Sequence, residues 1–378
     1  MIEKARTISR PLKKPKTYSI LLPLSWFYEL GVRFRNWLFN CGLLKSKSFN
    51  MPVISIGNIT VGGTGKTPHT EYIIELLKDS YNVGVLSRGY KRKSKGFVRA
   101  EQGKSTIYDI GDEPFQMWTK YPKVTFAVDA NRCNGIEKLM EDEVKPRIDV
   151  ILLDDAFQHR YVKPDINIVL VNYHRPIFLD KLLPAGRLRE PIVGKSRADI
   201  IIITKCPKDL TLEETRELEN GLSLQLDQSL FFTTFAYGDL YSLTDCEKII
   251  RLPYLSEEDA VLLLTGIASP TPIIEELNKY THNIHPVTFG DHHSFKEKDF
   301  KRIYKEYNKL PSDRRMIITT EKDATRLINH PMMDEELKSH CYILPIRVEF
   351  LTNNGTKFNK IIQDYVRKNT RNSILSKK

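Results

Sequence analysis

The stretch PVISIGNITVGGTGKTPHTEYIIELL (residues 52–77) decides the fold of this chain. An apolar run, PVISIG, leads into a glycine-rich turn that ends in Gly65-Lys66-Thr67, and a helical pattern follows. A strand, a glycine-rich loop and a helix in this order form a phosphate-binding loop, because backbone N–H groups and the helix N-terminus then face the phosphates. The stretch therefore predicts a nucleotide site at the start of an α/β domain.

One position departs from the pattern G-x-x-x-x-G-K-[ST], because Thr60 stands where the first glycine is expected. That glycine mainly relieves crowding at the turn, and Gly62 and Gly63 can supply the same freedom. The alternative is a glycine-rich turn that only caps a helix. On the first interpretation, Lys66 bridges the β- and γ-phosphates and Thr67 holds Mg²⁺. The residues expected to bind the nucleotide are Thr60, Val61, Gly62, Gly63, Thr64, Gly65, Lys66 and Thr67.

Further β-branched, apolar runs predict buried parallel strands at 52–57, 82–87, 123–129, 149–155, 166–172 and 199–205. Most alternate with helical stretches, which predicts a doubly wound, mainly parallel α/β sheet of the P-loop NTPase type. A second series at 260–268, 315–321 and 342–350 predicts a second, smaller α/β domain. We therefore expect a basic N-terminal segment with a helix (1–45), a P-loop domain (46–235) and a smaller C-terminal domain (236–378), joined through residues 231–250.

The sequence VILLDDAFQH (residues 150–159) supplies the carboxylate that the metal ion of a phosphate loop needs. Asp154 and Asp155 follow a hydrophobic strand, at the edge where open α/β sheets bind ligands, and either is a suitable ligand for Mg²⁺, directly or through water. Gln158 and His159 follow within one turn, and we expect them in the same crevice. The run TKC (204–206) resembles part of a guanine-reading N-K-x-D, but Pro207 replaces the aspartate, which favours ATP over GTP and turnover over switching.

The segment PLSWFYELGVRFRNWLFNCGLLK (residues 23–45) predicts an amphipathic helix. Its polar residues fall within an arc of roughly 80°, and most of the remaining circumference is aromatic or aliphatic. Such a surface needs cover, either from the core of the protein or from the boundary of a lipid bilayer, where Trp and Tyr partition well. We favour an anionic membrane surface, because basic residues precede the helix. The polar arc is Ser25, Glu29, Arg33, Asn36 and Asn40, and the basic residues are Lys4, Arg6, Arg10, Lys13, Lys14 and Lys16.

Composition limits the class of partner. The net charge of +11 over 378 residues favours an anionic partner, which is a nucleic acid, a membrane or a phosphorylated substrate. Nucleic acid is not expected, because the basic residues are dispersed and no nucleic-acid-binding motif occurs. The five cysteines lie far apart and resemble the reduced thiols of a cytosolic chain. No run of 18 uncharged apolar residues predicts a spanning helix.

Taken together, the phosphate loop, DDAFQHR (154–160) and LLPAGRLREP (182–191) resemble the tetraacyldisaccharide 4'-kinase family of lipid A biosynthesis. The stretches LSRGYKRKSKGF (86–97), GDEPFQM (111–117), FGDHHSF (289–295) and TTEKDATRL (319–327) also match, in the order of the family and over nearly the whole chain. The resemblance implies that ATP and Mg²⁺ phosphorylate the 4'-hydroxyl of a lipid-linked tetraacyl diglucosamine 1-phosphate. It also implies a hinge between two α/β domains, an active site between them, and a peripheral position on the cytoplasmic face of the bacterial inner membrane.

The resemblance further implies roles for single residues. Asp112 is implied as the base that orients or deprotonates the acceptor, acting beside the catalytic Lys66, and His292 is implied to support it, with His293 as the alternative. Glu190 is implied near the metal or nucleotide, and Arg88 near a phosphate or sugar phosphate. We expect Arg88 to bind substrate together with Gln158 and His159.

On the residues alone, each of these roles has a plain alternative. Asp112 is equally suited to a turn before Pro114, Glu190 to a salt-bridged turn with the neighbouring arginines, and Arg88 to an ordinary surface loop. Two other functions also stay open: a P-loop kinase or ligase for a soluble metabolite, and a membrane-bound nucleotide switch. The missing guanine signature and the candidate base argue against the switch.

Overall fold

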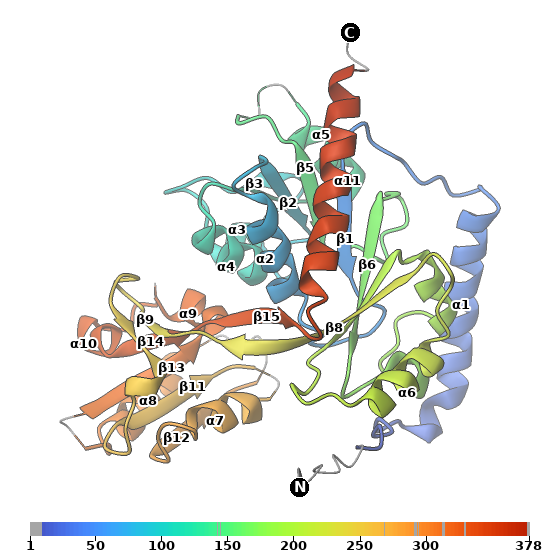
Figure 1. Ribbon diagram of the computed structural model, residues 1–378. Coiled ribbons are helices and arrows are strands. Elements are labelled where there is room, and N and C mark those ends of the chain that lie inside the picture. Colours follow the sequence, from blue (N-terminus) through green and yellow to red (C-terminus); the bar gives the residue numbers. More distant parts are fainter. Residues whose placement is uncertain are drawn as a thin grey trace, which may run out of the picture.

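The computed structural model describes residues 10–375, except for residues 142, 144, 268, 291, 292, 294, 312, 313 and 329. Within these residues the strands form two sheets, each accompanied by helices (Figure 1). The main sheet has nine strands in the order β15-β8-β7-β6-β1-β5-β2-β4-β3, and the smaller sheet has six in the order β10-β9-β14-β13-β11-β12. The predicted fold, a doubly wound α/β domain followed by a smaller one, is therefore confirmed.

The main sheet is parallel except at its two edges, where β3 and β15 run antiparallel to their neighbours. Its inner strands are buried on both faces, which explains their continuous apolar runs. The central strand β1 lies between β5 and β6, so the strand order reverses beside it, and open α/β sheets bind ligands at such a point. The strands are β1 (Val53–Gly57), β2 (Val83–Ser87), β3 (Val98–Arg99), β4 (Thr125–Val128), β5 (Val150–Asp154), β6 (Ile166–Asn172), β7 (Ile200–Thr204), β8 (Ser229–Tyr237) and β15 (Ile346–Phe350).

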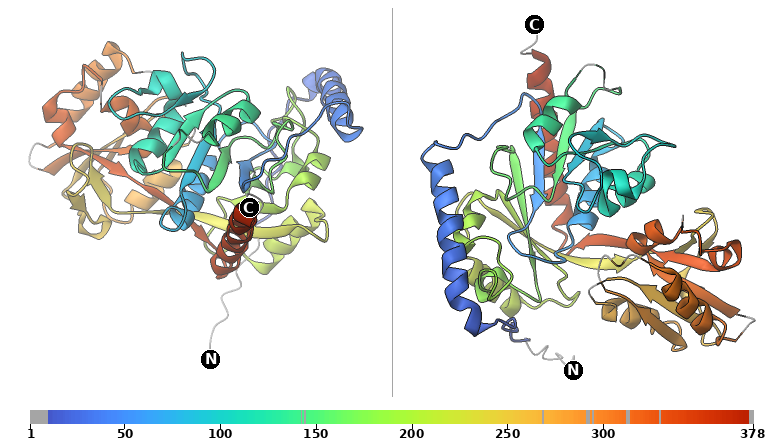
Figure 2. Two further views of the ribbon diagram at one scale, coloured as in Figure 1. Left: turned by 90° about the horizontal axis from the view of Figure 1, so that it is seen from above. Right: turned by 180° about the vertical axis from the view of Figure 1, so that it is seen from behind.

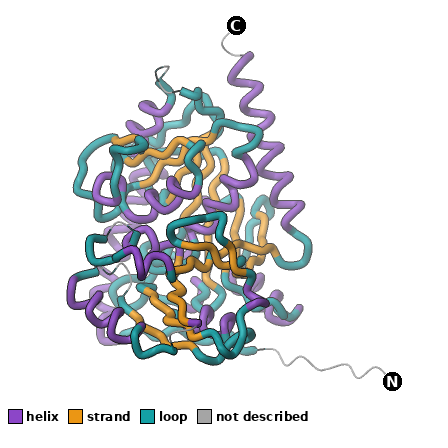
Figure 3. The backbone as a smooth tube through the Cα atoms, turned by 90° about the vertical axis from the view of Figure 1, so that its left-hand side faces the viewer, coloured by secondary structure: helices purple, strands orange, loops and turns teal. Residues whose placement is uncertain are grey.

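Helices cover both faces of the main sheet (Figures 1 and 3). On one face, α2 (Lys66–Leu77), α4 (Asp112–Lys120) and α11 (Gly355–Leu375) pack onto alternate residues of the strands. On the other face lie α5 (Arg132–Leu139) and α6 (Leu212–Leu222). The remaining short elements of this domain are α3 (Ile107–Ile110) and the 3₁₀ turns η2 (Ile177–Leu179) and η3 (Ile192–Arg197).

The smaller domain has its own core on both faces of the second sheet. Its central strands β12, β11, β13 and β14 are parallel, while β9 and β10 pair antiparallel at the edge. The elements are β9 (Leu240–Ser242), β10 (Ile249–Ile250), η4 (Leu252–Tyr254), β11 (Ala260–Thr265), α7 (Thr271–Leu277), β12 (Ile284–Thr288), α8 (Glu297–Tyr307), β13 (Arg315–Thr320), α9 (Glu321–Leu327), α10 (Glu335–Ser339) and β14 (Cys341–Leu344).

The chain returns to the main sheet at its C-terminal end, which differs from the expected division at residues 235 and 236. The run 342–350 was expected to be one strand, but Pro345 separates β14 of the smaller sheet from β15, which pairs with β8 of the main sheet. Proline has no N–H for a ladder, so a strand readily ends there. Helix α11 then buries Phe358, Ile362 and Val366 in the main core. Strands β8 and β15 together form the two-stranded connection between the domains (Figure 1).

The N-terminal helix α1 (Leu22–Asn40), preceded by η1 (Ser19–Leu21), lies along the main domain on the side away from the smaller one (Figures 1 and 2). Three residues of its polar arc, Ser25, Asn36 and Asn40, bond to the rest of the protein, whereas Glu29 and Arg33 pair with each other. The Ser25 hydroxyl donates to the carbonyl of Leu182 at 3.1 Å and accepts from the N–H of Ala185 at 3.0 Å. The Arg160 guanidinium donates to the side chain of Asn40 at 2.7 Å and to the carbonyl of Asn36 at 3.0 Å.

Six large apolar residues of α1 face outward instead, whereas Phe39 near the end of the helix is buried against Tyr161. Burial in the core, one of the two kinds of cover expected for this helix, is therefore excluded for these side chains. Tyr28, which reaches inward to the carbonyl of Arg189 at 2.7 Å, is an exception. No helix among the described residues is long and apolar enough to cross a bilayer. The outward side chains are between 55% and 75% exposed: Leu24, Trp26, Phe27, Leu30, Phe34 and Trp37.

Candidate active site

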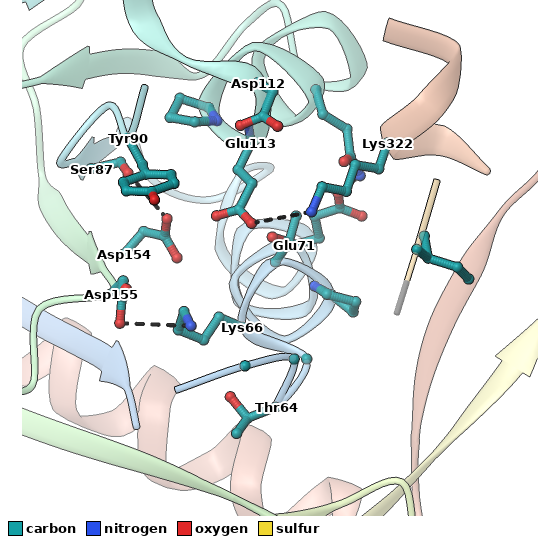
Figure 4. Close-up of a pocket in the computed structure, with 18 of the residues that line it drawn as sticks. Thr64, Lys66, Glu71, Ser87, Tyr90, Asp112, Glu113, Asp154, Asp155 and Lys322 are labelled. Carbon is teal, nitrogen blue, oxygen red and sulfur yellow. Dashed lines mark hydrogen bonds and ion pairs between the residues drawn. The ribbon is translucent and has the colours of Figure 1, made fainter. Parts of the chain in front are cut away.

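A cleft of about 580 Å³ lies where the carboxyl end of the main sheet meets the smaller domain (Figure 4). Its walls come from both domains, as the resemblance implied for the active site. The main domain contributes residues 60–68, Glu71, Ser87, Arg88, Tyr90, Asp112, Glu113, Pro114, Gln116, Asp154, Asp155 and Arg189. The smaller domain and the returning strand contribute Ile267, Thr320, Glu321, Lys322 and Ile346.

The phosphate loop joins β1 to α2 and lines the cleft over its whole length. Gly65 caps α2 with a φ of 84°, and Gly62 has a φ of 106°, both in the region that favours glycine. Thr60 is buried and forms an isolated antiparallel bridge with Leu188, so its backbone is extended and does not need a glycine. Threonine at position 60 is thus compatible with a phosphate-binding loop. The positive φ that favours glycine occurs at Gly62 instead.

Lys66 and Asp155 face each other across the mouth of the loop (Figure 4). The Lys66 Nζ lies 3.7 Å from Asp155 Oδ1, and the Arg189 Nη2 lies 3.2 Å from the same oxygen. Burial alone would raise the pKa of Asp155, but the charges of Lys66 and Arg189 outweigh it and hold the pKa below its ordinary value. Asp155 is therefore a carboxylate, and it keeps Lys66 beside the position that a phosphate would occupy.

Asp154 is almost completely buried behind Asp155, with a relative exposure of 1%. It accepts hydrogen bonds from Ser87 Oγ at 3.2 Å and from Thr70 Oγ1 at 3.4 Å. Burial, together with the neighbouring carboxylates of Glu113 and Asp155, raises the pKa of Asp154 to about 7. The two hydroxyl groups thus fix the orientation of Asp154 behind Asp155.

The oxygen atoms on this wall of the cleft suit a divalent cation. Thr67, Asp154 and Asp155 all line the cleft, and their oxygen atoms are the donors that Mg²⁺ prefers. The described part of the chain has no group of three or more acidic, histidine or cysteine side chains that could enclose a metal. Because Mg²⁺ usually takes one or two carboxylates plus phosphate oxygens and water, this donor set fits a cation that arrives with a nucleotide.

Asp112 lies on the opposite wall of the cleft, as the first residue of α4. Its Oδ1 accepts a hydrogen bond from the N–H of Glu113 at 3.0 Å, and its Oδ2 accepts one from Arg326 of α9. The neighbouring Glu113 lies 3.8 Å from Lys322 Nζ, also of α9 (Figure 4). The candidate base is thus in the cleft. Ion pairs with Arg326 and Lys322 of the smaller domain orient Asp112 and the neighbouring Glu113.

The histidine expected to support Asp112 cannot be placed, because His292 lies outside the described residues. His293, the alternative, is described and does not line the cleft. Its Nε2 donates to Asp299 Oδ2 at 2.8 Å, and its ring stacks on Phe289 with 4.7 Å between centroids. Both partners belong to the smaller domain, so this geometry gives His293 no role beside Asp112.

The other expected ligands are divided between the cleft and its surroundings. Arg88 is exposed and lines the cleft. Glu190 does not: it is buried, and its two oxygens accept hydrogen bonds from Arg197 at 2.9 Å each. A carboxylate used in this way is not directed to a metal ion, so the expected metal role of Glu190 is not supported by the structure. The alternative interpretation, a turn in which Glu190 forms an ion pair with the neighbouring arginines, was right about the ion pair, but the partner is Arg197.

Gln158 and His159 lie between the N-terminal helix and the sheet and do not line the cleft. The carbonyl of Gln158 accepts a hydrogen bond from Arg35 of α1 at 3.3 Å. Burial, and then the charges of Arg132, Arg35 and Arg88, lower the pKa of His159 to about 4. Its Nε2 is a buried atom with no hydrogen-bond partner in the structure. His159 is therefore a neutral histidine close to several arginines, and the structure does not bring it or Gln158 into the crevice where both were expected.

Sequence reasoning missed an ion-pair cluster that joins the domains. Lys120 Nζ lies 2.6 Å from Glu71 and 2.8 Å from Glu321, and so links α2, α4 and α9. Burial, followed by the charge of Glu321, raises the pKa of Glu71. The stretch TTEKDATRL contains Glu321, Lys322 and Arg326, all of which contact the main domain, and its place in the family pattern was the only sign of this role.

Known proteins resemble the chain over its length. A family model described as tetraacyldisaccharide-1-P 4'-kinase matches residues 17–367. Proteins named tetraacyldisaccharide 4'-kinase from Phocaeicola vulgatus and Bacteroides thetaiotaomicron are 55% and 52% identical; the alignments cover 94% and 96% of this chain and 97% of each relative.

A solved structure agrees with this assignment. The crystal structure of LpxK from Aquifex aeolicus in complex with ATP is 30% identical, with a TM-score of 0.71, and the match covers 92% of this chain and 98% of that one. The resemblance found in the sequence is thereby confirmed, and the chain belongs to the tetraacyldisaccharide-1-phosphate 4'-kinase family.

Proposed function

We propose that this chain transfers the γ-phosphate of ATP to the 4'-hydroxyl of a tetraacyl disaccharide 1-phosphate in lipid A biosynthesis. The observation that carries the proposal is the cleft itself, where a phosphate loop and the carboxylate of Asp112 line one cavity. Phosphoryl transfer needs these two parts, one to hold the donor and one to orient the acceptor oxygen. Family membership and the ATP-bound relative support ATP as the donor.

The donor side of the reaction belongs to the main domain. Backbone N–H groups of the loop and the N-terminus of α2 bind the phosphates, and Lys66 places its charge on the β- and γ-phosphates. Thr67, Asp154 and Asp155 are the residues that would hold Mg²⁺, which supplies charge neutralisation at the phosphate oxygens when bound. Arg189 keeps Asp155 oriented at 3.2 Å, so the carboxylate remains next to Lys66.

The acceptor side begins with Asp112. Its carboxylate orients the 4'-hydroxyl and accepts the proton as the oxygen attacks the γ-phosphorus in line. Arg326 fixes the carboxylate through its hydrogen bond, and His292 is proposed to support it as well. Arg88 is proposed to bind the anionic acceptor at the cleft, with Gln158 and His159 on the side of α1.

We also propose that α1 rests on the cytoplasmic face of the inner membrane as a peripheral anchor. The outward apolar face of the helix is the evidence, since its six large side chains are more than half exposed while Ser25, Asn36 and Asn40 of the polar arc bond to the protein. Lys13, Lys14 and Lys16 precede this face and suit anionic lipid headgroups. A helix that lies in the interface brings the enzyme to the acyl chains of its acceptor.

A labelled-phosphate assay tests the proposed function. The full chain in detergent is incubated with γ-labelled ATP, Mg²⁺ and a tetraacyl disaccharide 1-phosphate, and the expected product is a bisphosphorylated lipid. An acceptor blocked at the 4'-oxygen should stay unlabelled, and a deacylated acceptor tests the soluble-metabolite alternative in the same assay. If a preparation that binds ATP labels no lipid, the proposed function is wrong.

A further inference from the structure

His69 lies in the first turn of α2, three residues after Lys66, and its side chain is turned away from the cleft into the protein. It is buried, with a relative exposure of 3%. Its Nδ1 lies 2.7 Å from the carbonyl oxygen of Gly65, and its Nε2 lies 3.0 Å from the hydroxyl of Thr233 on β8. One ring therefore contacts both the phosphate loop and the strand that leads into the smaller domain.

These two contacts determine where the proton of the ring lies. A carbonyl oxygen only accepts hydrogen bonds, so Nδ1 carries the proton and donates it to Gly65. The ring is almost completely buried, which disfavours its charged form, so the proton on Nδ1 is the only one that it carries. Nε2 is then an acceptor, and the hydroxyl of Thr233 donates to it.

The hydrogen bond to Gly65 has a direct effect on phosphate binding. In a planar trans peptide the C=O of one residue and the N–H of the next point in opposite directions. When His69 holds the Gly65 carbonyl toward the body of α2, the N–H of Lys66 is held toward the cleft. The same carbonyl also accepts the N–H of His69 at 3.3 Å, so its direction is set by two donors.

A second contact presses the loop against β8. A Cβ atom at Gly65 would lie 2.7 Å from Cζ of Phe235, so this ring touches the glycine that turns the loop. Phe235 and Thr233 lie on the same strand and are paired with Val348 and Phe350 of β15, the returning strand between the domains. The turn of the phosphate loop is thus packed against the two-stranded connection and is linked to it through the two hydrogen bonds of His69.

We propose that His69 is a positioning residue of the phosphate loop: it orients the Gly65-Lys66 peptide toward the phosphates and ties it to β8. This inference rests on one part of the proposed function, the binding of ATP by the loop. It assigns a role to a residue that neither the phosphate-loop motif nor the proposed mechanism includes.

Three substitutions separate the hydrogen bond to Gly65 from the one to Thr233. In His69→Asn the side-chain amide reaches the position of Nδ1 and can still donate to Gly65, whereas in His69→Gln it reaches toward Nε2 and Thr233. Thr233→Val removes only the hydroxyl partner and leaves Nδ1 in place. His174→Gln, at an exposed histidine outside the cleft, is the matched control.

Equilibrium ATP binding to the full chain is measured first, by calorimetry and without lipid acceptor. We expect His69→Gln to weaken ATP binding by about tenfold, which is the effect of one well-placed hydrogen bond, and His69→Asn by no more than about threefold. In steady-state assays, His69→Gln should raise KM for ATP more than it lowers kcat. The control should bind like the wild type, and melting temperatures show that each variant is folded.

A spectroscopic measurement on the wild type tests the geometry even if a variant fails to fold. In a chain labelled with ¹⁵N-histidine, His69 should appear as the neutral Nδ1–H form, and Thr233→Val should shift its Nε2 signal. A ring protonated at Nε2 alone, or equal ATP affinities for folded His69→Gln and His69→Asn, overturns the proposal. ATP binding and the histidine spectrum are both measured without lipid. A failed transfer assay would therefore contradict the proposed function and not the role of His69.

Discussion

Arg326 of the smaller domain donates a hydrogen bond to the carboxylate of Asp112 in the main domain, so the candidate base is oriented by a residue from the opposite side of the cleft. Both side chains are well shielded, with exposures of 9% and 13%. Asp112 is also the first residue of α4, where the helix dipole favours a negative charge. The orientation of the candidate base therefore depends on where the smaller domain lies.

Replacing Asp112 by alanine should lower turnover by at least about a hundredfold while ATP binding changes little, because the donor is held by the loop on the other wall. Initial rates of lipid phosphorylation and ATP binding by calorimetry are the measurements. Arg326→Ala is the matched control, since it breaks the same ion pair but keeps the carboxylate. If Asp112→Ala turns over at a rate near that of the wild type, Asp112 is not the base.

Lys66→Ala should weaken ATP binding and turnover together, because the ammonium contacts phosphates in both the ground state and the transition state. We expect at least about a tenfold increase in the dissociation constant for ATP. Lys78→Ala is a suitable control, since this lysine caps the far end of the same helix and pairs with Glu75 on the surface. Normal ATP affinity in Lys66→Ala would contradict the assignment of the loop.

The order of elements in the main domain could be predicted from the sequence, because buried parallel strands have continuous apolar runs and the loop motif fixes one strand-helix junction. The return of β15 and α11 could not. The run 342–350 is apolar on both sides of Pro345, and no local pattern shows that its two halves pair with different sheets. Only contacts between residues far apart in the chain decide that pairing.

Sequence reasoning brought residues into the cleft where one motif holds them close in sequence, as in the loop and at Asp154 and Asp155. Prediction failed for Glu190, whose partner Arg197 lies on the following turn and competes with a metal for the same oxygens. The contacts of α9 were missed for another reason. Charged side chains on a short helix usually face water, and nothing local shows that Arg326 and Lys322 meet the main domain.

Changing the outward face of α1 should detach the chain from membranes without unfolding it. Trp26→Ser, Phe27→Ser and Leu30→Ser, combined, remove three exposed apolar side chains, so binding to anionic vesicles should weaken by at least about tenfold. Sedimentation with vesicles measures binding, and thermal unfolding checks the fold. Leu226→Ser, at a fully exposed position elsewhere, is the control and should sediment like the wild type.

Either of two results would contradict this account of α1. If the triple variant sediments normally, the face does not contact lipid. If it melts much earlier than the wild type, the three side chains support the fold, which their exposure does not suggest.

Acid should destabilise the chain through His159. Burial and the nearby arginines lower its pKa to about 4 in the folded protein, whereas an unfolded histidine has its ordinary value near 6.5. Between these values the unfolded chain takes up a proton that the folded chain refuses, so the free energy of unfolding falls as the pH falls.

Between pH 7 and pH 5 this histidine should account for about 2 kcal/mol of the decrease, an upper figure because its ring is only partly buried. Urea unfolding of the wild type and of His159→Gln at both pH values measures the difference. In the variant the decrease should be smaller by that amount, while His285→Gln, at an exposed histidine, should leave it unchanged. Equal decreases in all three proteins would show that His159 titrates normally and is not held in a desolvated site among the arginines.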